Sequence, residues 1–131
     1  MKIAIAICRF LLGIGFMIFG ANILCPFLPQ PPPAEGSLAA QFMSVMGPSH
    51  WMALVGVVQL VGGLLVLVGR TAPLGLVFLG PVLVNILAFH LCLMGGEGIA
   101  PGLVFSLLEI FLIYSYRGYF RQLFTANASP T

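Results

Sequence analysis

Long apolar runs, separated by short segments rich in proline, glycine or charge, dominate this chain. A helix needs about 20 mostly apolar residues to cross the hydrocarbon core of a bilayer. Breakers follow the first run ("CPFLPQPPPAEG") and the second ("GRTAP"), and another precedes the fourth ("GGEGIAPG"). The pattern predicts an all-α, polytopic membrane protein in which residues 1–131 form a single four-transmembrane-helix bundle. The expected spans are residues 3–24, 51–68, 74–94 and 99–116.

The segments outside the spans have patterns of their own. In the outer loop, residues 25–50, the run "PQPPP" favours an extended polyproline connector, with a ligand for an aromatic groove as the alternative. Apolar residues then recur at helical spacing in "SLAAQFMSVM", behind Ser37 as a cap, which predicts a short helix on the outer surface. In residues 117–131, arginines alternate with aromatic residues, which is typical of an amphipathic tail on the inner leaflet.

Composition strengthens the membrane interpretation. The chain is 60% hydrophobic and 6% charged, so a water-soluble fold would lack the polar surface to cover itself. Five Lys and Arg residues are too few to form a nucleic-acid surface, which excludes that class of partner. The N-terminal run resembles a signal peptide, but Arg9 interrupts its apolar core and no cleavage site follows. We therefore expect an uncleaved first span.

Charge predicts the orientation of the spans. Four spans place both termini and the turn after the second span on one side of the membrane. That side carries every basic residue, and Glu35, Glu97 and His50 belong to the other side. The positive-inside rule therefore predicts that both termini are cytoplasmic. The basic residues are Lys2, Arg9, Arg70, Arg117 and Arg121.

Two charged residues lie inside the expected spans. Arg9 and Glu109 each lie about 10 Å from the inner end of a span, counting 1.5 Å per helical residue. An ion pair between them would satisfy two groups that are costly in hydrocarbon. The alternative is that Arg9 extends to the inner headgroups and Glu109 is protonated. Gly102 and Ser106 share a face with Glu109, and this face is expected to point into the bundle.

The third span contains two more polar residues, Asn85 and His90. Asn85 shares a face with Pro81, which should kink the helix, and we expect this face inside the bundle. There Asn85 would bond to Gln59 or Asn22. His90 lies about 140° away around the helix and near the outer end, where it reaches headgroups or serves a ligand or a proton.

Glycines recur at helical spacing in three spans and predict close helix packing. The expected packing glycines are Gly13, Gly20, Gly56, Gly62, Gly63 and Gly102.

No pattern for a resident metal or cofactor is present in the sequence. The three cysteines lack C-x-x-C spacing, and they are expected to pack as free thiols, with a Cys25–Cys92 disulfide as the alternative. A bis-histidine haem would need His50 and His90, both near the outer surface, and is not expected. Metal-ligand spacings, nucleotide loops, nucleophile triads and flavin motifs are also missing from the sequence.

Three stretches of the chain resemble the DoxX-like family of small bacterial membrane proteins: "CRFLLGIGFMIFGAN", "GGLLVLVGRTAPLGLVFLGPVLVNILAFHL" and "LEIFLIYSYRGYFRQLF". The resemblance covers most of the chain outside the outer loop. It implies a four-helix protein of the bacterial inner membrane, with relatives linked to thiosulfate:quinone oxidation and to membrane complexes that resist oxidative stress. Residues of the matching type are Arg9, Gly20, Asn22, Gly62, Gly63, Asn85, His90, Glu109 and Arg117.

The chain departs from the family pattern at two positions. Gln59 stands where many relatives have Glu, and Gly56 stands where many have Lys. These differences remove a buried acid and its partner, which weakens the case for proton-linked chemistry in this chain.

The sequence is compatible with three functions. The first is a redox-associated membrane subunit that binds a quinone-like or lipid-like molecule, with the protein itself not expected to carry electrons as an isolated chain. The second is a non-catalytic interaction or scaffold protein, and the third is a small-solute transporter acting as an oligomer. Expected partners are membrane lipids, a redox enzyme or a second copy of the chain. The ligand-binding candidates are Arg9, Asn22, Gln59, Asn85, His90 and Glu109.

Overall fold

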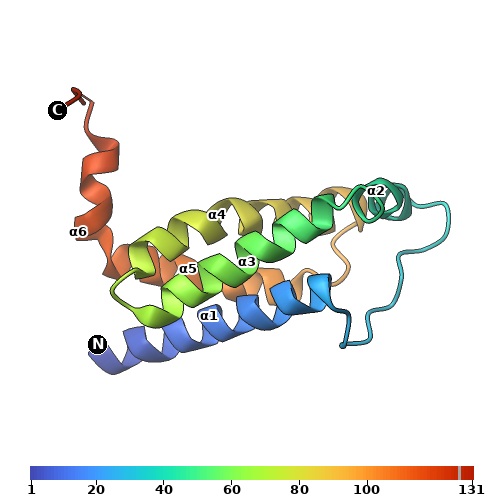
Figure 1. The fold of residues 1–131 in the computed structure, drawn as a ribbon, viewed down its shortest axis with the longest axis horizontal. Helices are drawn as coiled ribbons and strands as arrows, with labels where there is room; N and C mark the ends of the chain where they lie inside the picture. Colours follow the sequence, from blue (N-terminus) through green and yellow to red (C-terminus); the bar gives the residue numbers. More distant parts are fainter. Residues whose placement is uncertain (127) are drawn as a thin grey trace.

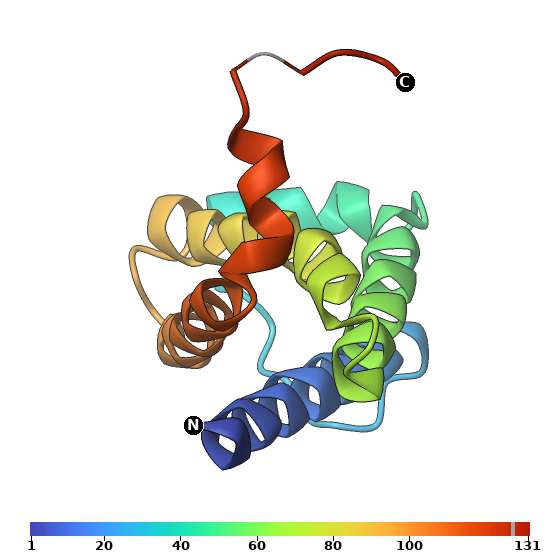
Figure 2. The same cartoon turned by 90° about the vertical axis from the view of Figure 1, so that its left-hand side faces the viewer.

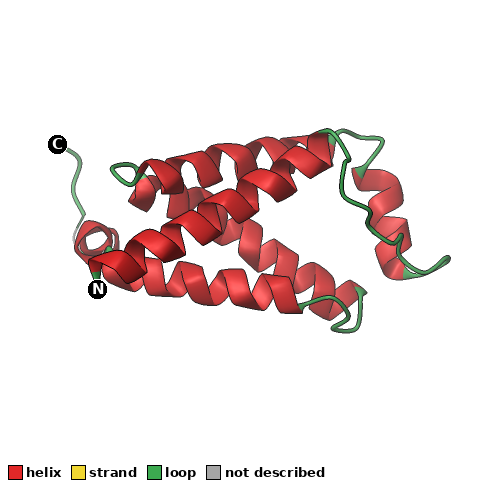
Figure 3. Cartoon of the chain, turned by 90° about the horizontal axis from the view of Figure 1, so that it is seen from below, coloured by secondary structure: helices red, strands yellow, loops and turns green. Residues whose placement is uncertain are grey.

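The computed structural model describes residues 1–126 and 128–131, and within them it contains helices and connecting segments but no strand (Figure 3). The all-α prediction is therefore confirmed for this part of the chain. The four longest helices are α1 (Lys2–Leu24), α3 (Trp51–Val68), α4 (Ala72–Ala88) and α5 (Ala100–Ser115). The shorter elements are α2 (Leu38–Met46), the π-helical turn η1 (Phe89–Leu93), α6 (Arg117–Phe120) and the 3-10 helix η2 (Arg121–Phe124).

In the part of the chain that the structure describes, three helical stretches are long and apolar enough to cross a membrane: α1, α3, and α4 continued by η1. A fourth is formed if α5 and the short helices after it count as one broken span, and these are bent from each other by 77°. The residues of α6 and η2, Arg117–Phe124, are called the C-terminal arm below. The membrane character predicted from the apolar runs is thus consistent with the helix lengths.

The long helices run back and forth along one direction (Figure 1). Helix α1 packs along α3, α3 against α4, and α5 against both α4 and α1. The N-terminus, the α3–α4 turn and the bend after α5 all lie at one end, which we call the basic end, and α2 lies at the other end (Figure 1). The C-terminal arm turns away across the basic end, in front of α4 in the end-on view (Figure 2).

Close approach of α1 and α3 depends on glycine. A Cβ atom on Gly20 would lie 2.7 Å from the Gly56 carbonyl oxygen, and one on Gly63 would lie 2.7 Å from the Gly13 oxygen. Backbone meets backbone at both points, so a side chain there would force the helices apart. The other two expected packing glycines also lie in tight contacts, because a Cβ on Gly62 would meet Leu79 and one on Gly102 would meet Ile86.

Large apolar side chains fill the space between the helices beside these glycines. Those with essentially no exposed surface are Leu12, Phe16, Val66, Leu76, Leu79 and Leu112. Phe120 of the C-terminal arm belongs to the same buried cluster. The bent arm is therefore anchored to the rest of the fold by a core residue.

Helix α2 covers the segment in which apolar spacing predicts a short helix. The Ser37 hydroxyl accepts a hydrogen bond from the Ala40 backbone N–H at 3.1 Å and so caps its N-terminus. The ring of Phe42 packs against Phe89 of η1, with centroids 5.6 Å apart. This contact holds the surface helix against the end of α4.

Candidate functional site

The candidate ligand-binding residues do not converge on one site. Asn22, Gln59 and Glu109 are buried, Arg9 and His90 are half-buried, and Asn85 is exposed. Each has different neighbours in the fold. Glu109 lines a groove, and it is the centre of the candidate site.

The Glu109 carboxyl group is buried without a partner. Its side chain is 3% exposed, and neither carboxyl oxygen has a hydrogen-bond partner among the described residues. Gly80 of α4 faces it, because a Cβ atom there would lie 3.2 Å from Glu109 Oε1. A carboxyl group removed from water and left unpaired is costly, so this position is one where a ligand could compensate the cost.

An apolar groove lies over this carboxyl group, between α4, α5 and the C-terminal arm. Its volume is about 200 Å³. Pro81 lies inside α4 and has no backbone N–H, so the carbonyl of Val77 lacks its usual helical donor at the groove. The groove is lined by Leu76, Val77, Gly80, Pro81, Glu109, Ile113, Phe120, Leu123 and Phe124. We call it the Glu109 groove.

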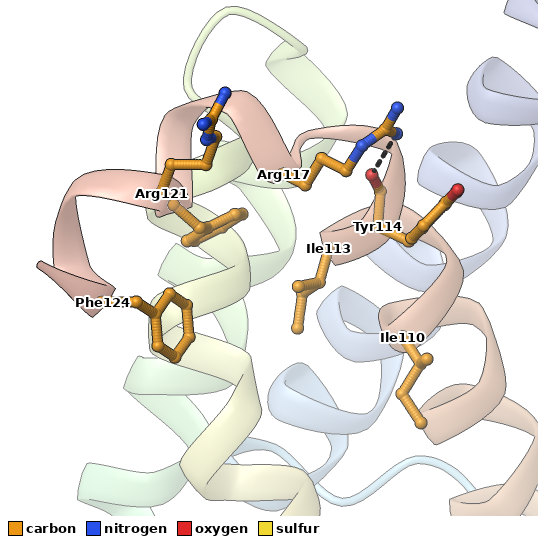
Figure 4. Close-up of a pocket in the computed structure, with 7 residues that line it drawn as sticks. Ile110, Ile113, Tyr114, Arg117, Arg121 and Phe124 are labelled. Atoms are coloured by element: carbon orange, nitrogen blue, oxygen red, sulfur yellow. Dashed lines mark hydrogen bonds between the residues drawn. The ribbon is translucent and has the colours of Figure 1, made fainter.

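A second cavity of about 350 Å³ adjoins the Glu109 groove and shares Ile113, Phe120 and Phe124 with it. It is lined further by Ile110, Tyr114, Arg117 and Arg121 (Figure 4). Arg117 Nη1 donates to the Tyr114 carbonyl oxygen at 3.0 Å, and the guanidinium lies 4.5 Å from the centroid of the Tyr114 ring. We call this cavity the arm cavity.

The Arg9–Glu109 ion pair expected from their depth is not formed in the described part of the chain. Instead Arg9 donates from Nη2 to the Leu67 carbonyl oxygen and from Nη1 to the Tyr116 hydroxyl, each at 3.4 Å. Leu67 lies in the last turn of α3, where carbonyl groups lack helical donors and attract a cation. Arg9 therefore turns toward the basic end and away from Glu109.

Asn22 stabilises the chain immediately after α1. Its Oδ1 accepts hydrogen bonds from the backbone N–H groups of Phe27 at 2.9 Å and Leu28 at 2.7 Å. Gln59 is 4% exposed, and its Oε1 has no partner among the described residues. The expected bond from Asn85 to either residue is not formed.

The expectation that Asn85 faces the interior is wrong. Asn85 and its face-mates Pro81, Ala88 and Cys92 are all exposed. Asn85 Nδ2 donates to the Pro81 carbonyl oxygen at 2.9 Å, so an intrahelical bond satisfies part of the amide. Helix α4 instead buries its bulky leucines, among them Leu76 and Leu79, against the neighbouring helices.

His90 lies in the π-helical turn that ends α4. Its Nδ1 is 2.8 Å from the Ile86 carbonyl oxygen, and its ring packs edge-on against Phe89 at 5.4 Å. The sequence pattern predicts a helix here but not the π-helical turn. All three cysteines, Cys8, Cys25 and Cys92, are free, and no group of metal-ligating side chains forms within residues 1–126 and 128–131.

Sequence reasoning missed the residues that complete both cavities. Phe120, Leu123 and Phe124 line the Glu109 groove from the arm, and Val77 and Gly80 line it from α4. The alternation of arginines and aromatics in "YRGYFRQLF" indicates an amphipathic arm, but only the bend shows which helices it covers. Comparison with protein-family models, curated proteins and solved structures found no match to this chain.

Proposed function

We propose that this chain is a DoxX-like, four-helix transmembrane bundle of the bacterial inner membrane that binds a quinone-like or lipid-like molecule in the Glu109 groove. In this role it serves as a redox-associated or stress-defence membrane subunit. The observation that carries the proposal is the unpartnered carboxyl group of Glu109 beneath an apolar groove. The resemblance described above supplies the redox context.

The chemistry of the groove suits an amphiphile. Apolar walls from α4, α5 and the arm would take a ring or an alkyl tail, and one polar group would fix its orientation. A protonated Glu109 can donate to a quinone carbonyl, and an ionised Glu109 can accept from a quinol hydroxyl. The quinone and the quinol can therefore each form a hydrogen bond with one protonation state of Glu109.

In this proposal the chain binds and positions the carrier, and a partner oxidoreductase supplies the electron transfer. The chain crosses the membrane with both termini in the cytoplasm. The arrangement of charge supports this orientation, because the exposed Lys2, Arg70, Arg117 and Arg121 lie on segments of the basic end, whereas Glu35 and Glu97 lie on loops of the opposite end. The positive-inside rule assigns the basic end to the cytoplasm.

The test is mass spectrometry of the protein after gentle extraction from its native membrane. We expect a co-purifying quinone or lipid in the wild type and its loss in Glu109→Leu, which keeps the side-chain bulk but removes the polar group. Glu97→Leu is the matched control, because Glu97 is exposed and lies outside both cavities. The proposal fails if the wild type carries no such molecule, or if a folded Glu109→Leu variant retains it fully.

The exposed Asn85 face favours a second candidate function, an interaction protein that pairs through α4. An amide facing hydrocarbon gains from a partner amide on another helix. Cys92 is exposed on the same face, so a symmetric pair would bring two copies of Cys92 together. Oxidative crosslinking in native membranes, with Cys8 and Cys25 replaced by serine, should then give a covalent dimer, and Asn85→Leu should reduce its yield.

A further inference from the structure

We propose that the arm cavity binds an anionic phospholipid, with an acyl chain along Ile110 and Ile113 and the phosphate held by Arg117 and Arg121. This inference rests on the membrane placement proposed above but not on ligand binding at Glu109. It adds a lipid site to the candidate site already described. The four named residues all line the cavity.

The bend after α5 gives the cavity a charged side and an apolar side, which together suit an amphiphile. The arm departs from α5 at 77°, so it runs along the membrane surface when α5 crosses the bilayer. Figure 4 shows both guanidinium groups near the level of the bend, while Ile110 and Ile113 lie further down α5. Charge thus faces the headgroup layer, and the apolar lining faces the acyl chains.

Charge complementarity selects an anionic lipid. Within the described residues, no ion pair involves Arg117 or Arg121, and the acidic side chain nearest in the fold, Glu109, is buried under the neighbouring groove. Arg117 is held in place by its bond to the Tyr114 carbonyl oxygen and by the Tyr114 ring. The donors that Arg117 does not use there, together with those of Arg121, fit phosphate oxygens, which guanidinium groups bind in a bidentate geometry.

The apolar side of the cavity, where an acyl chain would lie, distinguishes this site from a basic surface patch. Phe120 is buried and fixes the arm to the core, whereas Phe124 is exposed and lines the cavity wall. Ile110 is 63% exposed, although it faces a cavity of about 350 Å³. An acyl chain would cover this surface, and the headgroup would end at the arginines.

The experiment counts lipids bound to the full chain in detergent by native mass spectrometry, titrating phosphatidylglycerol against phosphatidylcholine. Each basic residue at an anionic surface contributes roughly fivefold in affinity. We therefore expect the wild type to prefer phosphatidylglycerol, and Arg117→Gln/Arg121→Gln to lose roughly 25-fold in affinity for it. The charge-matched control is Lys2→Gln/Arg70→Gln, which removes two exposed charges from the same end and leaves the cavity lining unchanged.

Two further variants separate the parts of the proposal. Ile110→Trp fills the arm cavity without touching the arginines and should also weaken phosphatidylglycerol binding, whereas Leu107→Trp, at an exposed position of the same helix outside both cavities, should leave it unchanged. The lipid site would be overturned if Ile110→Trp still bound phosphatidylglycerol, or if inorganic phosphate displaced the lipid. Either result would show that the arginines bind phosphate without the tail. Equal losses in the arginine pair and in the Lys2/Arg70 control, or no preference for phosphatidylglycerol, would overturn it as well. Circular dichroism is the control that each variant keeps its helices.

Discussion

Arg9 of α1 and Tyr116 at the end of α5 meet across the basic end, with Arg9 Nη1 3.4 Å from the Tyr116 hydroxyl oxygen. The same guanidinium also donates to the Leu67 carbonyl oxygen of α3. One arginine thus links three helices, and its partner Tyr116 lies 107 positions away from it in sequence. The charged side chain of Arg9, which lies within an apolar run, therefore joins α1 to the ends of α3 and α5.

Replacing Tyr116 with phenylalanine should weaken this junction. The substitution removes the hydroxyl acceptor but keeps the ring, and a hydrogen bond of this kind contributes about 0.5–1.5 kcal/mol. We expect the free energy of unfolding, measured by SDS titration in mixed micelles, to fall by that amount. Tyr114→Phe is the control, because the Tyr114 side chain is 65% exposed. An equal loss in both variants would show that the Arg9 bond contributes nothing specific.

Gly20→Ala should destabilise the α1–α3 contact. The added Cβ would lie 2.7 Å from the Gly56 carbonyl oxygen, which cannot move without shifting the helix. Overpacking of this kind costs about 1–3 kcal/mol. Gly118→Ala adds the same methyl group where no neighbouring side chain or packed helix lies within 4 Å, and it should be neutral or slightly stabilising because alanine favours helix. Thermal unfolding in detergent measures both, and equal melting temperatures for the two variants would contradict the packing role.

The apolar runs predict the helices closely because each run ends at an unambiguous breaker. Helix α3 covers Trp51–Val68, the residues expected for the second span, and α5 covers Ala100–Ser115, within one residue of the expected 99–116 at each end. The orientation of each helix about its own axis was harder to predict. In a membrane protein the faces toward lipid and toward other helices are both apolar, so periodicity does not identify the buried face. The polar amide and the face shared with Pro81 predict that Asn85 points into the bundle, but Asn85 is exposed.

The candidate site depends on side-chain directions and helix packing that sequence spacing does not predict. Counting residues along the helices gives Arg9 and Glu109 a similar depth but no direction for their side chains, and Arg9 donates to the Leu67 carbonyl oxygen of α3. The burial of Glu109 agrees with its expected inward face. The groove over it depends on the 77° bend and on Phe120 entering the core, both of which arise from tertiary packing.

Asn22→Ala should loosen the chain after α1. The variant leaves the backbone N–H groups of Phe27 and Leu28 without the acceptor they share, at an expected cost of about 1–3 kcal/mol. Asn22→Asp keeps an acceptor oxygen and should recover much of the stability. Limited proteolysis of the outer loop is the local readout, with faster cleavage expected in Asn22→Ala than in Asn22→Asp. Identical cleavage rates in these variants and the wild type would leave no role for the two bonds.

The proposed orientation predicts opposite labelling of the two ends by a membrane-impermeant maleimide in intact cells. Cys25 is exposed at the end of the molecule opposite the basic end, so it should react from outside when Cys8 and Cys92 are replaced by serine. A cysteine introduced by Thr131→Cys, with all three native cysteines replaced, should react only after the cells are permeabilised. The charges explain the expectation, because translocating the arginines of the arm and of the α3–α4 turn is disfavoured. Labelling of the C-terminal cysteine in intact cells, with Cys25 protected, would reverse the orientation and would place the arm cavity in the outer leaflet.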